Sequence, residues 1–140
     1  MTEPPTPLQL ALERIGDRWS LLIIDALQGG PLRFSDLTEQ VRGIAPNTLS
    51  SRLTRLETDG VIVADAYSER PVRYEYQLTA AGRDLAGALR LLAHWGVRLA
   101  DESAVIRHDL CGTPLEPRWY CASCERVVAE TDAGAEIRMV

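Results

Sequence analysis

Apolar residues recur at helical spacing through the first part of the chain. The apolar positions 8, 12 and 15 predict a first helix behind Thr6-Pro7, a pair that suits a helix cap and a first turn. Asp17 is placed to cap a second helix over residues 18–28. The glycines and the proline at 29–31 end that helix. The chain therefore begins with two helices separated by a short break.

Two further helices, joined by a tight turn, are predicted over residues 35–42 and 46–59. Ser35 is expected to cap the first of them, and Pro46 falls in the first turn of the second, where a missing N–H is tolerated. Leucines at 49, 53 and 56 recur at i, i+4 and i+7 and form one apolar stripe. The polar residues expected on the opposite face are Asn47, Thr48, Ser51, Arg52 and Arg55.

Residues 61–78 have the pattern of a β-hairpin. One strand is predicted from residue 61 to about residue 67, and the other over residues 73–78, where polar and apolar residues alternate. Tyr74, Tyr76 and Leu78 are expected to face inwards. A short strand is also predicted at 32–34. A hairpin that directly follows two helices of this kind forms a wing.

A long helix is predicted over residues 80–101, with Thr79 as its cap. Leucines at 85, 89, 92 and 99 form one stripe, and Leu91, Trp95 and Val97 extend the apolar surface beyond it. A terminal helix that is apolar on more than one side has a second surface to cover, and we expect its partner to be another copy of the chain. The alternative is a helix docked wholly within its own domain.

These elements predict a mainly α fold with a small β-hairpin wing, which is the winged helix-turn-helix arrangement. The second helix of this arrangement can enter the major groove of double-stranded DNA. There, amide and arginine side chains read base edges and hydroxyl groups contact phosphates. Arg70 and Arg73 in the wing are placed to contact the DNA backbone or a minor groove.

The formal net charge of −5 is unusual for a nucleic-acid binder. Binding requires local positive charge, however, and residues 40–56 contain Arg42, Arg52 and Arg55 and no acidic residue. The longest aliphatic run, at 21–24, is stopped by Asp25, so no membrane-spanning segment is expected. The first residues lack the pattern of a secretory signal, and we expect a cytoplasmic protein.

Five segments follow one another in a familiar order: IGDRWSLLIIDAL (15–27), GPLRFSDL (30–37), GIAPNTLSSRLTRLETDGVI (43–62), RPVRYEYQLTAAG (70–82) and ALRLLAHWG (88–96). Together they resemble the HxlR-type winged helix-turn-helix transcriptional regulators, which are related to the MarR group. The resemblance implies a homodimer held by its terminal helices and bound to a pseudo-palindromic operator. It also implies that the residues nearest DNA are Ser35, Asn47, Thr48, Ser51, Arg52 and Arg55, with Arg70 and Arg73 in the wing.

The chain departs from this family pattern in two places. Many members carry a cysteine before the first helix that serves in thiol sensing, whereas residues 4–7 contain none. The first wing strand often carries a basic residue where this chain has Ala64-Asp65. The second departure predicts weaker phosphate contacts from the wing and a larger part for the helix at 46–59.

All three cysteines fall beyond the region of resemblance, close to a histidine. The spacing is His108-x-x-Cys111, nine residues, and then Cys121-x-x-Cys124. An x-x spacing lets one tight turn direct two ligands at one ion, so two such pairs supply the four ligands of a tetrahedral zinc site. Short strands are expected at 119–120 and 127–128. The sequence predicts a small C-terminal zinc ribbon with a structural Zn²⁺ and no catalytic residue.

Two other interpretations of the cysteines stay open. Cys121 and Cys124 could form a redox pair, which would make the chain a small thiol protein or a redox-responsive regulator, although no strand-helix unit surrounds them. The cysteines could also be incidental. Paired ligand spacings in a cytoplasmic chain favour metal over disulfides.

The predicted organisation is a winged domain with its terminal helix at 1–103, a zinc-ribbon-like segment at 104–128 and a flexible tail at 129–140. The predicted function is that of a dimeric, sequence-specific DNA-binding transcriptional regulator, with repression as the expected direction. A small-molecule effector is compatible with the sequence, which does not identify one. A winged domain that binds protein instead of DNA is a third possibility, kept open by Ala64-Asp65.

Overall fold

The computed structural model describes residues 4–101 and 105–128, and the chain divides into two units, Met1–Leu89 and Arg90–Val140. The predicted tail at 129–140 lies outside the described residues. The predicted domain boundary at 103–104 also lies outside the described residues and stays a prediction. The two units meet after Leu89, within the helix Ala86–Ala100.

Both helices at the start of the chain have the caps that the sequence predicts. Helix α1 spans Pro7–Ile15, and the Thr6 hydroxyl accepts a hydrogen bond from the Gln9 backbone N–H at 3.2 Å. Helix α2 spans Arg18–Ala26, and the Asp17 carboxylate accepts hydrogen bonds from the backbone N–H groups of Trp19 and Ser20, both at 3.1 Å. A 3₁₀ turn, η1 (Leu27–Gly29), follows α2.

The two central helices are α3 (Phe34–Gln40) and α4 (Pro46–Thr58). The prediction that Ser35 caps α3 is wrong, because the helix starts at Phe34 and its cap lies two residues earlier, at position 33. Strand β1 (Leu32–Arg33) leads directly into it, Arg33 is the cap residue, and the Asp36 carboxylate accepts a hydrogen bond from the Arg33 backbone N–H at 2.9 Å. Ser35 is therefore an exposed residue in the first turn.

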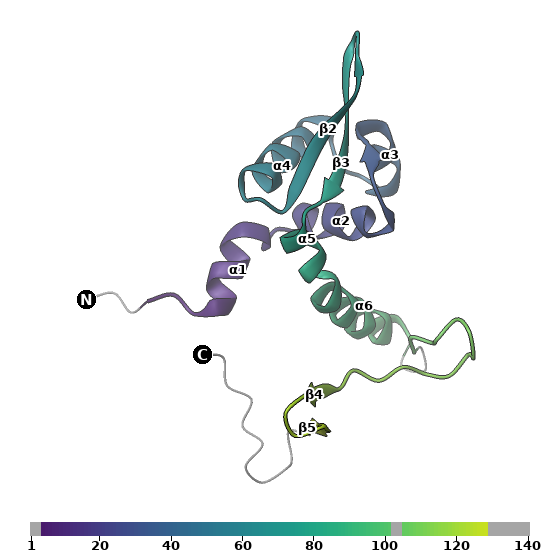
Figure 1. The fold of residues 1–140 in the computed structure, drawn as a ribbon. Helices are drawn as coiled ribbons and strands as arrows, with labels where there is room; N and C mark the ends of the chain where they lie inside the picture. The colour runs from purple at the N-terminus through teal and green to yellow at the C-terminus, as the bar shows by residue number, and fades with distance from the viewer. Residues whose placement is uncertain (1–3, 102–104, 129–140) are drawn as a thin grey trace. The chain divides into compact units, whose positions relative to one another are not determined.

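The wing is the hairpin of β2 (Ile62–Glu69) and β3 (Val72–Leu78), and the sheet has the antiparallel order β1-β3-β2. Leu78 is buried and Tyr76 is partly buried, as predicted. The expectation that Tyr74 faces inwards is wrong, since 47% of it is exposed. The hairpin extends beyond the helices at its base (Figure 1), so the alternating pattern continues where no core lies beneath it.

A single core joins the helices to the base of the hairpin. In Figure 1, α2, α3 and α4 surround the lower part of β2 and β3. The leucine stripe of α4 is almost fully buried, which confirms the predicted periodicity. The buried apolar residues are Ile23, Ile24, Leu27, Leu37, Val41, Ile44, Leu49, Leu53, Leu56, Val61, Ile62, Leu78 and Leu89.

The predicted helix over 80–101 is two helices, α5 (Ala80–Asp84) and α6 (Ala86–Ala100). Thr79 caps α5 as predicted, since its hydroxyl accepts a hydrogen bond from the Gly82 backbone N–H at 3.1 Å. The break falls at Leu85, whose N–H bonds to the Gly82 carbonyl three residues back, as in a 3₁₀ turn. Gly82 and Gly87 flank the break and lower the local helix propensity.

The described part of the second unit contains no buried residue. Strands β4 (Trp119–Cys121) and β5 (Arg126–Val128) form a two-stranded antiparallel sheet, as the sequence predicts. Across residues 4–101 and 105–128, no helix has both the length and the apolar content that crossing a bilayer requires.

Candidate DNA-binding site

Helix α3, a five-residue turn and helix α4 form the helix-turn-helix unit of the first domain. Gly43 has a φ of +83°, a conformation that favours glycine, and the Ile44 N–H donates to the Val41 carbonyl at 3.3 Å. Val41 and Ile44 are buried in the core beside the leucines of α4. The turn between α3 and α4 is therefore held from inside by these two buried side chains.

The N-terminus of α4 is suited to a phosphate group. Ala45 is the cap residue and supplies no side-chain hydrogen bond, and the first turn has no acidic residue. The first N–H groups of a helix have no partner within it, and they lie at the positive end of the helix dipole. Backbone N–H groups in this position commonly bind DNA phosphates.

The exposed face of α4 is polar. Asn47 and Ser51 are exposed as predicted, whereas Thr48 is partly buried. Thr54 is also exposed and was not among the predicted site residues. Positions 47, 51 and 54 are spaced at i, i+4 and i+7, so the periodicity that identified the leucines could also have identified Thr54.

Arg52 does not lie on the face opposite the leucines, which corrects the predicted placement. Its Nε is 2.8 Å from Oδ1 of Asp17, and only 29% of its side chain is exposed. Position 52 follows Leu49 by three residues and therefore lies at the edge of the buried stripe. Asp17, which sequence reasoning assigned only as a cap, thus links the start of α2 to α4. Contact between Arg52 and DNA stays a prediction.

Several groups surround the Asp17 carboxylate. Its Oδ2 accepts a hydrogen bond from the buried Ser20 hydroxyl at 2.5 Å. Burial acts to raise the pKa of Asp17, but hydrogen bonds from Ser20 and Arg52 outweigh it and hold the pKa below its ordinary value. The carboxylate is therefore charged at neutral pH, and Arg52 has a stable partner.

Arg55 is exposed but also has contacts within the first unit. Its Nη2 donates a hydrogen bond to the backbone carbonyl of Glu13 in α1, and its Nε lies 3.8 Å from Oδ2 of Asp59. About half of the side chain is exposed, at 51%. The contact with Glu13 joins α1 to the helix that is expected to read DNA.

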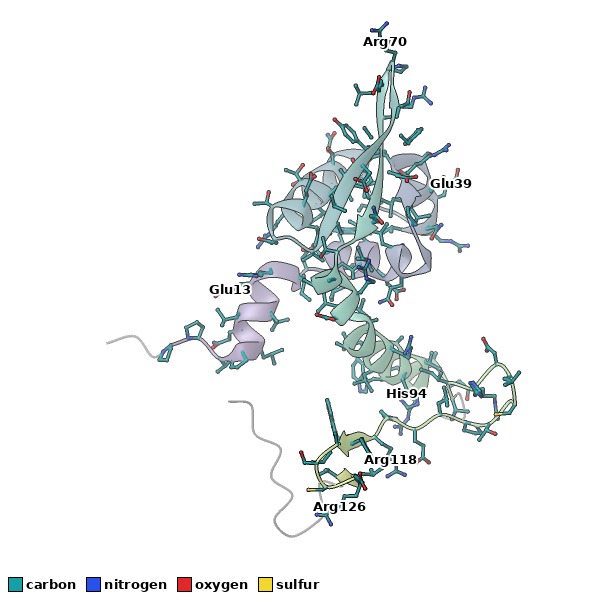
Figure 2. The ribbon with its side chains drawn as sticks, in the orientation of Figure 1. Glu13, Glu39, Arg70, His94, Arg118 and Arg126 are labelled. Carbon is teal, nitrogen blue, oxygen red and sulfur yellow. The ribbon has the colours of Figure 1, made fainter. Side chains whose placement is uncertain are left out.

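The wing presents its arginines to solvent. Arg70 lies at the tip of the hairpin (Figure 2), and Arg73 pairs with Ser68 across it. Both are exposed. Asp65, which stands where a basic residue is common in the family, accepts a hydrogen bond from the Gln77 side chain across the strands. The guanidinium of Arg33 lies 4.4 Å from the centre of the Tyr67 ring, which adds a cation at the hairpin that the sequence did not reveal.

The four predicted zinc ligands lie in the second unit, in two separate pairs. His108 Nδ1 and Cys111 Sγ are 3.2 Å apart. Within the part of the chain that the structure describes, no three His, Cys, Asp or Glu side chains gather at one metal-sized site. The second pair is Cys121 and Cys124, both free thiols.

The thiols differ in acidity. Hydrogen bonds from the side chain and backbone of Thr113, and then from His108, lower the pKa of Cys111 to about 7. Hydrogen bonds from the Cys124 backbone N–H, and then from the Cys124 side chain, lower the pKa of Cys121. The hydrogen bond between the two side chains, and then the charge of Cys121, raise the pKa of Cys124. Cys111 and Cys121 are thus the residues that become thiolates first.

Comparison with known proteins identifies the family that has this arrangement. Residues 14–104 match the family model described as HxlR-like helix-turn-helix. The chain belongs to the HxlR-like helix-turn-helix family. Among curated members, the chain is 42% identical over 118 residues to the HTH-type transcriptional regulator Rv3095 of Mycobacterium tuberculosis, itself uncharacterized, across 81% of this chain and 74% of that one. It is 37% identical to YvaP of Bacillus subtilis, across 66% and 86% of the two chains.

Solved structures agree with the family assignment. The redox regulator HypR in its reduced form is 28% identical, with a TM-score of 0.65, and the match covers 69% of this chain and 96% of HypR. The reduced form of the transcriptional regulator YodB from Bacillus subtilis is 29% identical, with a TM-score of 0.59, across 72% of this chain and all of YodB (100%). The winged helix-turn-helix fold predicted from the sequence is confirmed, and the relatives are named as transcriptional regulators.

Proposed function

We propose that this HxlR-like chain is a homodimeric repressor that binds a pseudo-palindromic operator in double-stranded DNA. The observation that supports it is the polar face of α4, backed by a fully buried leucine stripe and preceded by an uncapped helix N-terminus. Such a helix fits the major groove, where Asn47 and Ser51 meet base edges and phosphates. Arg70 and Arg73 contact the backbone beside it.

The second part of this proposal is the dimer. Helix α6 exposes Leu92, Trp95 and Leu99 by 53%, 63% and 70%. Such a row of large apolar side chains is costly to leave in water, and a second copy of the same helix covers it in a self-complementary way. Two recognition helices about 34 Å apart then match successive turns of the major groove.

Repression is the direction of regulation that we propose for such a complex. A dimer that covers an operator within a promoter excludes RNA polymerase from the same DNA, so repression requires no additional surface. In vitro transcription from a bound promoter tests the direction: a fall in transcript supports a repressor, and a rise contradicts it.

The DNA-binding proposal is tested by selecting bound sequences from a random DNA pool and then titrating the selected site. Asn47→Ala and Ser51→Ala should each weaken specific binding by about 1–3 kcal/mol, the usual value for one base contact. The matched control is Gln28→Ala, an exposed residue of η1, which should bind as the unchanged protein does. Equal affinity of all three variants would contradict the placement of α4 in the groove.

The dimer is tested on the same protein by sedimentation. Trp95→Glu should shift the dimer to monomer, because a charge in an apolar contact is costly. A chain that is monomeric without the substitution would contradict the dimer.

A redox-responsive regulator is the second candidate, and two observations favour it. HypR is named as a redox regulator, and the Cys121–Cys124 pair has one thiol with a lowered pKa. If this candidate is correct, diamide or hypochlorite should change DNA affinity in the unchanged protein but not in Cys121→Ser.

A small-molecule effector stays a prediction, as does a winged domain that binds protein. If DNA affinity did not change with salt concentration, the protein-binding winged domain would be favoured.

A further inference from the structure

Two turns in the second unit have the same local construction. In the first, the His108 N–H donates to the Thr113 carbonyl at 2.9 Å, so residues 108 and 113 pair across the turn. In the second, Cys121 pairs with Arg126 in the register of β4 and β5. Each pairing therefore joins a candidate ligand to the residue five positions later.

The other landmarks of the two turns also coincide. Cys111 and Cys124 each lie three positions after the first ligand of their turn. The next residue is in the left-handed conformation in both cases, with φ of +69° at Gly112 and +51° at Glu125. A residue other than glycine seldom adopts this conformation, so its recurrence at the same offset indicates one turn type used twice.

The first turn already holds its two ligand atoms near metal-binding separation. Zn–S and Zn–N bonds of about 2.3 and 2.0 Å at a tetrahedral angle place nitrogen and sulfur about 3.5 Å apart. The observed distance between His108 Nδ1 and Cys111 Sγ is 3.2 Å. The Gly112 N–H donates to the His108 carbonyl at 2.7 Å, which fixes the backbone between them.

Residues 105–128 have no apolar core to hold these turns together. Leu110 is 90% exposed, and Trp119 and Tyr120 are 61% and 63% exposed. A segment this small without buried residues needs another source of folding free energy, and a structural metal ion supplies it in many small domains. Three cysteines and one histidine give a closed set of four ligands, whereas three cysteines cannot all pair in disulfides within one chain.

We propose that the two turns are the halves of one tetrahedral Zn²⁺ site, with His108, Cys111, Cys121 and Cys124 as its ligands. Neither turn alone fills a tetrahedral structural site, because each provides two ligands. One ion shared between them brings the two turns together, and the chain at 115–118 is the connection that adjusts. Binding releases the remaining thiol protons and leaves no open position, so the site is structural. This inference is independent of DNA binding.

The test is metal analysis of the full-length protein after dialysis against zinc and then against buffer. Native mass spectrometry should show one zinc ion per chain. Cys111→Ser in the first turn and Cys121→Ser in the second should each lose it, since both halves are required. His108→Asn should also lose zinc, while His94→Asn, the matched control in α6, should retain it.

A second measurement separates ligand loss from misfolding. Cobalt added to the metal-free, unchanged chain should give the visible absorption of tetrahedral, thiolate-bound Co²⁺, and zinc should displace it. Octahedral cobalt spectra, two zinc ions per chain, or full zinc retention in Cys111→Ser would each overturn the shared site. Dissociation of a dimer on zinc removal would overturn it too, because the ion would then join two chains.

Discussion

The guanidinium of Arg52 lies 2.8 Å from the carboxylate of Asp17, 35 residues earlier in the chain. The same carboxylate caps α2 through the backbone N–H groups of Trp19 and Ser20. One acidic residue therefore fixes the start of α2 and the middle of the proposed recognition helix together. Because Arg55 also donates to the Glu13 carbonyl in α1, the direction of α4 depends on both N-terminal helices.

We predict that Asp17→Asn weakens specific DNA binding even though it removes one negative charge from the chain. The amide can still cap α2, but it loses the charged partner of Arg52. Arg52→Ala should cost about 1–3 kcal/mol in binding, the range for one lost contact. If Arg52 acts through Asp17, the double variant should lose no more than Arg52→Ala alone, as measured by electrophoretic titration. Additive losses would show that Arg52 contacts DNA independently of Asp17.

The Asp17 pair should also make stability depend on pH in a defined direction. The pKa of Asp17 is lowered from 3.8 in the folded state, so its stabilising effect is present above that value and is lost as pH falls through the lower folded-state pKa. Urea midpoints of the unchanged protein and Asp17→Asn should therefore differ at pH 6 and converge in strong acid. A difference that grew as pH fell would contradict the lowered pKa.

Loss of either wing arginine should reduce the salt dependence of DNA binding. Each phosphate contact contributes about −0.9 to the slope of log affinity against log salt, so Arg70→Ala and Arg73→Ala should each reduce the slope by about 1. The preferred sequence should not change. Arg118→Ala is the control, because Arg118 pairs with Glu116 outside the winged domain. An altered sequence preference in Arg73→Ala would instead place that residue on a base edge.

Gly82→Ala should destabilise the winged domain. A Cβ at Gly82 would lie 2.2 Å from the Val61 carbonyl oxygen and 3.1 Å from the Leu78 side chain, so the backbone must move. Overpacking of this kind costs about 1–3 kcal/mol, which thermal unfolding would show as a lower Tm. Gly87→Ala is the matched control, since a Cβ there has nothing within 4 Å, and it should be neutral or stabilising. Equal Tm values for the two variants would contradict this packing.

Local signals in the sequence were sufficient for most of the fold. The caps at Thr6, Asp17 and Thr79 were predicted because a capping side chain bonds to an N–H only two or three residues away. The stripe of α4 and the hairpin at 62–78 follow from periods of 3.6 and 2 residues, which one segment reveals by itself. The same signals carried the family resemblance that residues 14–104 confirm.

The direction of individual side chains was decided only by tertiary structure. Arg52 and Arg55 find partners 35 and 42 residues away, and no local pattern specifies contacts at that separation. Tyr74 continues a correct alternation into solvent, because period alone does not say where the core ends. The spacing of the histidine and the three cysteines between His108 and Cys124 predicts a metal site. Where the two ligand pairs lie relative to each other depends on residues 105–128, which have no apolar core of their own. The sequence therefore determined most of the helices and strands, while packing between distant segments determined which polar side chains remain exposed.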